Sequence, residues 1–107
     1  MTTIRTVNEM GTRQGANESI TYTVTTTPWG SSPTSLVVAV TDRTNYTIAT
    51  PLDVTATVMP TNSPSAVGDV ITLSPLKLLT ASHTYRVAVR FTVSGNVEEC
   101  YFDVIGE

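Results

Sequence analysis

The carboxyl-terminal segment, residues 80–107, constrains the fold most, because its polarity alternates like two strands joined by a tight turn. The turn is Ser94-Gly95-Asn96. A period of two is typical of a strand with one buried face and one solvated face. The residues predicted on the buried faces are Tyr85, Val87, Val89, Phe91 and Val93 before the turn and Cys100, Phe102 and Val104 after it. The sequence therefore predicts a β-hairpin, and this hairpin carries no catalytic signature.

The composition agrees with a β-rich globular domain. Threonine supplies 21 of the 107 residues, which suits pleated, half-buried surfaces. Hydrophobic residues make up 40% of the chain, which argues against disorder, although only 14% of the residues are charged. A chain of this length fits one domain.

The charge balance excludes some classes of partner. The formal net charge of −3 would repel a phosphate backbone, so no nucleic-acid partner is expected. Arg86 and Arg90 share the polar side of the first hairpin strand, and we expect them to pair with Glu99 or Asp103 across the hairpin. No signal peptide and no apolar run near membrane-spanning length is recognisable, so no membrane association is expected.

Shorter segments with strand character precede the hairpin. Residues 1–17 show little periodicity and are interpreted as an N-terminal arm that a partner orders, followed by one domain over residues 18–107. The segment 61–65 is predicted to be an exposed loop, and Pro75–Leu79 to contain a single turn of helix. The remaining predicted strands are Ser19–Thr27, Ser35–Asp42, Tyr46–Ala49, Val54–Met59 and Asp69–Leu73.

Strands this short, with no amphipathic helices between them, predict an all-β fold. About seven strands in total would form two antiparallel sheets packed as a sandwich. Tyr85 follows Leu79 and a short polar turn, which resembles the tyrosine corner of immunoglobulin and fibronectin type III domains. In that corner the phenol hydroxyl bonds to the backbone upstream. We therefore expect an immunoglobulin-like or fibronectin type III-like sandwich.

Residues that could perform chemistry are few and dispersed. His83, the only histidine, is predicted to be solvated in a turn, and Cys100 to be a small buried hydrophobe. A glycosidase-like pair would need two acids brought together from distant positions, which a small domain without a long lid disfavours. The acids Asp42, Asp53, Asp69, Glu98 and Glu99 show no metal-loop spacing. We expect no enzymatic activity, catalytic residue, metal or cofactor.

Several short motifs occur in a fixed order along the chain. They are Glu18-Ser19-Ile20-Thr21-Tyr22, Pro28-Trp29-Gly30, a valine-rich strand, a Leu-Thr-Ala turn into Tyr85-Arg86-Val87, and Phe91-Thr92-Val93-Ser94-Gly95-Asn96-Val97-Glu98. In these motifs the chain resembles small immunoglobulin-like virion proteins of tailed bacteriophages. The resemblance covers most of the chain after residue 14, and residues 59–66 depart from it. The related proteins include fibre-tail adaptors, capsid decoration subunits and connector subunits.

This resemblance implies a non-enzymatic assembly protein of the virion, made in the host cytoplasm. The implied partners are capsid, connector, tail or fibre proteins and copies of the chain itself, in a homo-oligomer. The predicted interaction residues lie in the arm, in the Pro-Trp-Gly loop and at the start of the predicted strand Tyr46–Ala49: Ile4, Arg5, Val7, Arg13, Trp29 and Tyr46. Trp29 is interpreted either as a plug that caps the end of the sandwich or as an anchor for a partner.

A second hypothesis is a carbohydrate-binding or surface-binding fibronectin-like module. Such a module needs a planar set of exposed aromatic side chains, and the sequence offers Trp29, Tyr46 and Tyr101 for it.

Overall fold

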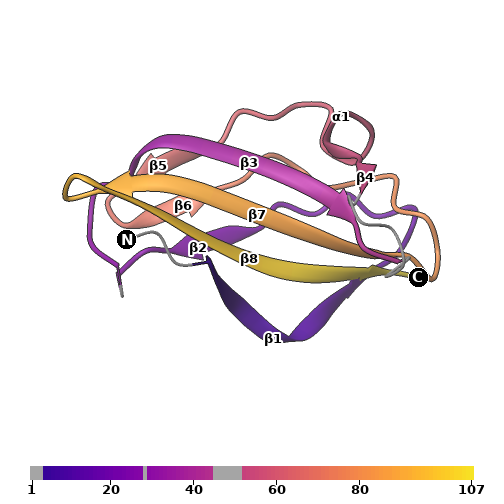
Figure 1. Cartoon of the computed structure of the whole chain (residues 1–107). Helices are drawn as coiled ribbons and strands as arrows, with labels where there is room; N and C mark the ends of the chain where they lie inside the picture. The colour runs from indigo at the N-terminus through magenta and orange to yellow at the C-terminus, as the bar shows by residue number, and fades with distance from the viewer. Residues whose placement is uncertain (1–3, 28, 45–51) are drawn as a thin grey trace.

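The computed structural model describes residues 4–27, 29–44 and 52–107. In this part of the chain, eight strands form two sheets, and one short helix lies outside them (Figure 1). This arrangement confirms the predicted all-β, two-sheet architecture. The larger sheet has the order β1-β8-β7-β3-β4 and contains Ile4–Gln14 (β1), Thr34–Asp42 (β3), Leu52–Asp53 (β4), Thr84–Val93 (β7) and Asn96–Gly106 (β8). The smaller sheet has the order β2-β6-β5 and contains Thr23–Thr25 (β2), Ser65–Val67 (β5) and Val70–Thr72 (β6).

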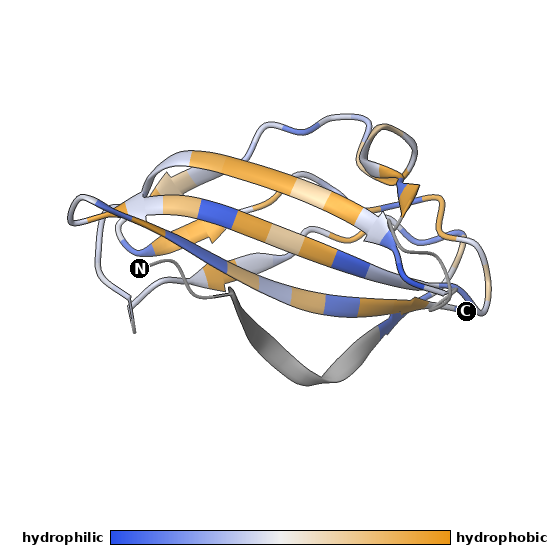
Figure 2. Ribbon diagram, in the orientation of Figure 1, coloured by the Kyte–Doolittle hydropathy of each residue, from blue (hydrophilic) through white to orange (hydrophobic). Residues whose placement is uncertain are grey.

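The hairpin of β7 and β8 forms the centre of the larger sheet, as its alternating pattern predicts. The two strands pair antiparallel from Thr84 with Ile105 to Val93 with Asn96. Ser94 and Gly95 between them have φ values of 52° and 81°. Positive φ at both central residues gives the turn a twist that matches the strands it joins. Apolar and polar residues alternate visibly along both strands (Figure 2).

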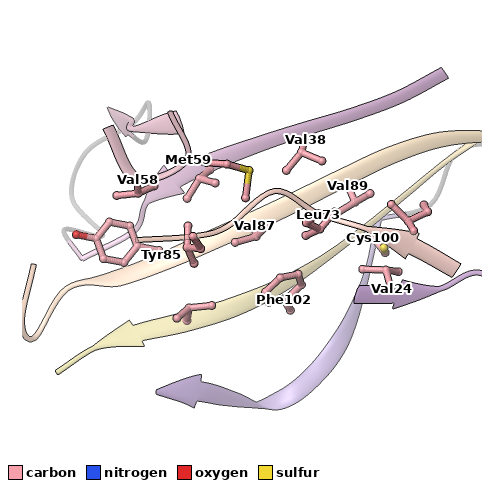
Figure 3. Packing of buried hydrophobic residues seen from close by; sticks show 14 of the residues in the cluster. Val24, Val38, Val58, Met59, Leu73, Tyr85, Val87, Val89, Cys100 and Phe102 are labelled. Carbon is pink, nitrogen blue, oxygen red and sulfur yellow. The ribbon is translucent and has the colours of Figure 1, made fainter. Parts of the chain in front are cut away.

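The hydrophobic core lies between the two sheets. All eight residues predicted on the buried faces of the hairpin are buried in the structure. Val24 and Ile71 of the smaller sheet belong to this cluster. Val58 and Met59, at the end of the short helix, also belong to it, and Figure 3 shows them together with Val24. Burial of apolar side chains from both sheets supplies the main favourable term in folding.

β1 makes the only parallel ladder among the described strands. It pairs with β8, whereas the other ladders are antiparallel, so the prediction of two fully antiparallel sheets is wrong at this edge. The register runs from Ile4 with Glu99 to Gln14 with Gly106 and shifts twice. Because β1 and β8 are separated by most of the chain, no local turn pattern could predict their pairing.

The segment Val54–Met59, predicted to be a strand, instead contains the helix α1 (Thr55–Val58). The Asp53 carboxylate accepts hydrogen bonds from the Thr55 amide, at 2.9 Å, and from the Thr55 hydroxyl, at 2.7 Å. Such a bond to the residue two positions on turns the backbone. These bonds also lower the pKa of the Asp53 carboxyl, backbone hydrogen bonding being the largest cause. β4 therefore ends at Asp53, although the Val54 amide still donates to the Val40 carbonyl oxygen at 2.9 Å.

Other predicted boundaries also differ. Only Thr23–Thr25 of the predicted strand Ser19–Thr27 is a strand, although Ile20 forms an isolated bridge with Leu76. This bridge occupies Pro75–Leu79, where the predicted helical turn is absent from the structure described. The predicted loop 61–65 ends as β5 begins at Ser65. The predicted strand Tyr46–Ala49 lies outside the described residues.

Candidate functional site

The N-terminal segment is the first candidate contact region. The sequence predicts an arm over residues 1–17, and the structure places residues 4–14 in β1, at the edge of the larger sheet. Ile4, Arg5 and Val7 of the predicted interaction set belong to this strand. The weak alternation of the segment has a physical reason, because two register shifts interrupt the period of two.

Gln14 joins the end of β1 to the segments around Glu18 and Leu76, a role that its sequence position did not indicate. Its side chain is fully buried, and its amide Nε2 donates to the Leu76 carbonyl oxygen at 2.6 Å and to the Glu18 carbonyl oxygen at 3.1 Å. The Tyr22 hydroxyl donates to Gln14 Oε1 at 2.8 Å. Burial, followed by the nearby Glu18 carboxylate, raises the pKa of the Tyr22 phenol. A buried glutamine is uncommon, so polarity alone suggested an exposed position.

The Trp29 loop is the second candidate contact region. The Trp29 and Gly30 amides both donate to the Thr26 carbonyl oxygen at 2.8 Å, and the Thr26 hydroxyl donates to the Gly30 carbonyl oxygen at 2.8 Å. The half-buried Trp29 ring meets the Phe91 ring edge-on, with 5.7 Å between centroids and 70° between planes. This packing corresponds to the plug interpretation of Trp29.

Gly30 permits that close packing. Its φ is 144°, a value that L side chains rarely adopt, and a Cβ atom on it would lie 2.2 Å from Val93 Cγ1. Glycine therefore meets two requirements here, namely a positive φ and a close approach between the loop and β7.

A two-residue turn between β5 and β6 is fastened to this loop. The Asp69 carbonyl oxygen accepts from the Thr26 amide at 2.7 Å, and the Gly68 carbonyl oxygen accepts from the Ser32 amide at 3.2 Å. The Thr27 hydroxyl also donates to the Asp69 carboxylate. We call residues 26–27 and 29–32 of the loop, the turn 68–69 and the turn 94–95 together the Trp29 end.

The Trp29 end combines an ordered backbone with exposed apolar side chains. Val67 and Val70 flank the turn 68–69 as cross-strand partners, and their exposed fractions are 81% and 36%. Six of the eight described residues with positive φ lie at or beside this end: Gly30, Ser32, Ser35, Gly68, Ser94 and Gly95. Backbone in such conformations persists where the surroundings determine it, and it gathers at functional loops.

The opposite end of the sandwich, which we call the Tyr85 end, contains Gln14, Asp42, His83, Tyr85 and the C-terminal residues 106–107. The Tyr85 hydroxyl accepts a hydrogen bond from the Thr80 amide at 2.8 Å, as the tyrosine-corner resemblance predicts. The Gly106 amide donates to the His83 carbonyl oxygen at 2.9 Å, and the Glu107 amide donates to the Gln14 carbonyl oxygen at 2.9 Å. The C-terminal end of β8 is thereby joined to two other segments.

His83 lies in the predicted turn and is partly exposed, but its ring also contacts a carboxylate, which the sequence did not predict. Its Nδ1 lies 2.7 Å from Asp42 Oδ2, because residue 83 precedes β7 and Asp42 ends the adjacent β3. Burial acts to raise the pKa of the Asp42 carboxyl, but hydrogen bonds from Thr44 and His83 and the charge of His83 lower it overall. The described residues contain no cluster of three or more His, Cys, Asp or Glu side chains that could hold a metal ion.

Polar pairing across the hairpin follows the predicted pattern in part. Arg86 Nε lies 3.1 Å from Asp103 Oδ1, and the Arg86 guanidinium lies 4.0 Å above the centre of the Tyr101 ring. Arg90 is opposite Glu99 in the register, but no ion pair links these two described residues. Exposed ion pairs contribute little to stability, so this difference has little energetic weight.

Cys100 is a buried hydrophobe, as predicted. Its side chain faces the core from β8 and is fully inaccessible to solvent. Burial, followed by the nearby Glu99 carboxylate, raises the pKa of the Cys100 thiol to about 11. The thiol therefore stays protonated at neutral pH and lacks the thiolate that nucleophilic chemistry requires.

The structure separates the predicted interaction residues instead of gathering them at one site. Arg13 is exposed at the Tyr85 end, where its guanidinium lies 3.6 Å from the Glu107 carboxylate. Trp29 lies at the other end of the β7–β8 hairpin, and Tyr46 falls outside the described residues. Sequence reasoning missed Val67 and Val70, for which a two-residue Gly-Asp turn between valines was the available signal.

Comparison of this chain with protein-family models, with curated proteins and with solved structures finds no match. No helix in the described ranges combines the length and apolar character of a membrane span.

Proposed function

We propose that this chain is a non-enzymatic structural protein of tailed-bacteriophage particles that acts through contacts with copies of itself and with other virion proteins. The motif resemblance supports the class of protein. The tyrosine-corner hydrogen bond between Tyr85 and Thr80 supports an immunoglobulin-like or fibronectin type III-like type of sandwich.

The exposed apolar pair on the Trp29 end carries this proposal. Val67 and Val70 project from a turn that backbone hydrogen bonds fasten to the Trp29 loop. Apolar side chains held on an ordered frame lose little conformational entropy when a partner covers them, which favours their use at protein interfaces. The contact we propose is therefore made by this end together with the β1 edge.

The carbohydrate-binding hypothesis receives less support from the aromatic side chains. The Trp29 ring packs on Phe91 at the core, and the Tyr101 ring is covered by the Arg86 guanidinium. A sugar-stacking platform needs ring faces that are open to solvent together. These two rings lie in different parts of the molecule and are already in contact with protein.

The test is quantitative mass spectrometry of purified particles produced by the phage or prophage that encodes the chain. We expect a fixed copy number relative to the major capsid protein. The double variant Val67→Ser/Val70→Ser should keep the wild-type melting temperature and lose incorporation, whereas Leu78→Ser, at another exposed apolar position, should be incorporated normally. Absence of the wild-type chain from particles would reject the proposed function.

The contribution of the N-terminal segment is tested separately. A chain lacking residues 1–8 keeps the buried Gln14 side chain and its hydrogen bonds, so it should fold, as judged by circular dichroism, and should be incorporated less than the full chain. Undiminished incorporation of this shortened chain would show that the segment makes no required contact.

A further inference from the structure

The pairing of β1 with β8 contains more chain on one strand than on the other. Between the first and last register pairs, β1 advances ten residues, from Ile4 to Gln14, while β8 advances seven, from Glu99 to Gly106. The largest mismatch lies between Asn8 and Thr12, where β1 advances four residues and β8 advances two. At roughly 3.3 Å per residue, three surplus residues correspond to about 10 Å of extended chain.

The surplus chain bends away from the sheet. Figure 1 shows β1 leaving β8 in its middle and returning toward it near its end. Residues 9–11, which include Gly11, have no register partner on β8 and divide the strand into two paired stretches. A parallel ladder is slightly weaker per residue than an antiparallel one, and this ladder is also interrupted.

The two paired stretches are held very differently. The second stretch, Thr12–Gln14, is fixed by the buried Gln14 side chain and by the hydrogen bond from the Glu107 amide. The first stretch, residues 4–8, is joined to that anchor only through the bend. A short connection that must buckle in the monomer is a feature that promotes exchange of an element between identical chains.

We propose that residues 4–8 exchange between two copies of this chain, so that the first half of β1 of one copy pairs with β8 of the other. Residues 9–11 act as the hinge, and Thr12–Gln14 stays in its own molecule. The exchanged strand makes the same register pairs that it makes in the monomer, while the surplus residues extend between the two molecules. The proposal rests on the assembly role above and names a second copy as the partner.

The test uses full-length chains that carry a single cysteine in a Cys100→Ala background. One chain carries Ile4→Cys and the other Glu99→Cys, because these positions are register partners. The two chains are mixed in denaturant, refolded together at high concentration and oxidised, and their disulfide products are identified by non-reducing electrophoresis and mass spectrometry. A disulfide between the two variants can form only between molecules.

We expect the mixed disulfide to exceed both homodisulfides. The control pair, Arg13→Cys mixed with Ile105→Cys, should show no such excess, because Gln14 anchors that stretch in its own chain. Deletion of residues 10–11 should abolish the excess at the first pair by removing most of the surplus chain. A mixed disulfide no more abundant than the homodisulfides would overturn the exchange, and an equal excess at the control pair would overturn the hinge.

The wild-type chain provides a second measurement that needs no variant. After refolding at high concentration, sedimentation velocity should show a dimer whose share grows with the refolding concentration. A chain that stays monomeric would contradict the exchange. If that monomer is nevertheless incorporated into particles, the proposed function stands without the exchange; a dimer that is absent from particles would reject the function and keep the exchange.

Discussion

At the Trp29 end, backbone amides of the loop bond to carbonyl oxygens of the same loop and of the turn 68–69, whereas at the Tyr85 end the long, fully buried Gln14 side chain joins β1 to residues 18 and 76. Backbone bonding leaves side chains such as Val67 free to face outward, while the Gln14 amide must be buried to reach Leu76. The comparison indicates that the Trp29 end can present a surface, whereas the Tyr85 end chiefly fastens the chain.

The largest effect on this comparison should come from Trp29→Ala. Removing an aromatic plug that packs against Phe91 should lower the free energy of unfolding by about 3 kcal/mol. Urea unfolding followed by circular dichroism measures the change. Val67→Ala, at an 81% exposed position, is the control and should stay within about 0.5 kcal/mol of wild type. Equal stability of the two variants would show that Trp29 does not cap the core.

Gln14→Leu addresses the Tyr85 end. It leaves the Leu76 carbonyl and the Tyr22 hydroxyl without their partner, so the free energy of unfolding should fall by about 2 kcal/mol. Chemical denaturation of this variant beside Arg13→Leu, at the exposed neighbouring position, measures the effect. If both variants unfold like wild type, buried polar bonds do not hold this end.

Gly30→Ala probes the backbone of the Trp29 end. The added methyl would lie 2.2 Å from Val93 Cγ1 at a φ of 144°, and the expected destabilisation is about 2 kcal/mol. Combining it with Val93→Ala removes the steric overlap but not the unfavourable φ, so the double variant should lose less than the sum of the single losses. Strict additivity would contradict a close approach of loop and strand.

Tyr85→Phe should have a smaller effect. It removes the hydroxyl that accepts the Thr80 amide and keeps the ring in the core, so the expected loss is about 1 kcal/mol. Thermal unfolding, compared with that of Tyr101→Phe, measures it. If only Tyr101→Phe lowers the stability, the Tyr85 hydroxyl does not contribute to it.

The Asp42 carboxyl at the Tyr85 end adds a pH dependence to the free energy of unfolding. Because the pKa of Asp42 is lowered in the folded chain, its contribution is present above the unfolded pKa, about 3.9, and is lost as the pH falls through the folded value. Asp42→Asn should therefore flatten the loss of stability in this acidic range. Urea midpoints between pH 7 and pH 2 measure the slope, and an unchanged slope would mean that Asp42 contributes nothing to it.

Sequence patterns predicted the parts of the fold that depend on local alternation. The β7–β8 hairpin, the strand near Ser35–Asp42 and the buried state of Cys100 follow from apolar periodicity. The helix α1 was not predicted from alternation. There the Asp53 carboxylate accepts the Thr55 amide, which would otherwise be available for a strand hydrogen bond.

Long-range pairing explains the remaining differences. Three contacts join residues far apart in sequence. They are the parallel ladder of β1 with β8, the hydrogen bond from Gln14 to Leu76 and the contact between Asp42 and His83. The packing of Trp29 against the core agrees with the plug interpretation of its Pro-Trp-Gly loop. The hairpin turn Gly68-Asp69 between Val67 and Val70 was recognisable in the sequence, but alternation alone did not show that these two valines are exposed.

The most direct test of the unequal fastening of the chain is hydrogen exchange of backbone amides along β1, measured by NMR at a dilution where the chain is monomeric. We predict slow exchange for the hydrogen-bonded amides of Thr12–Gln14, Glu107 and the Trp29 loop, and clearly faster exchange for residues 4–8. Equal protection along the whole of β1 would contradict the account, because the first half of the strand would then be anchored as firmly as the Gln14 end.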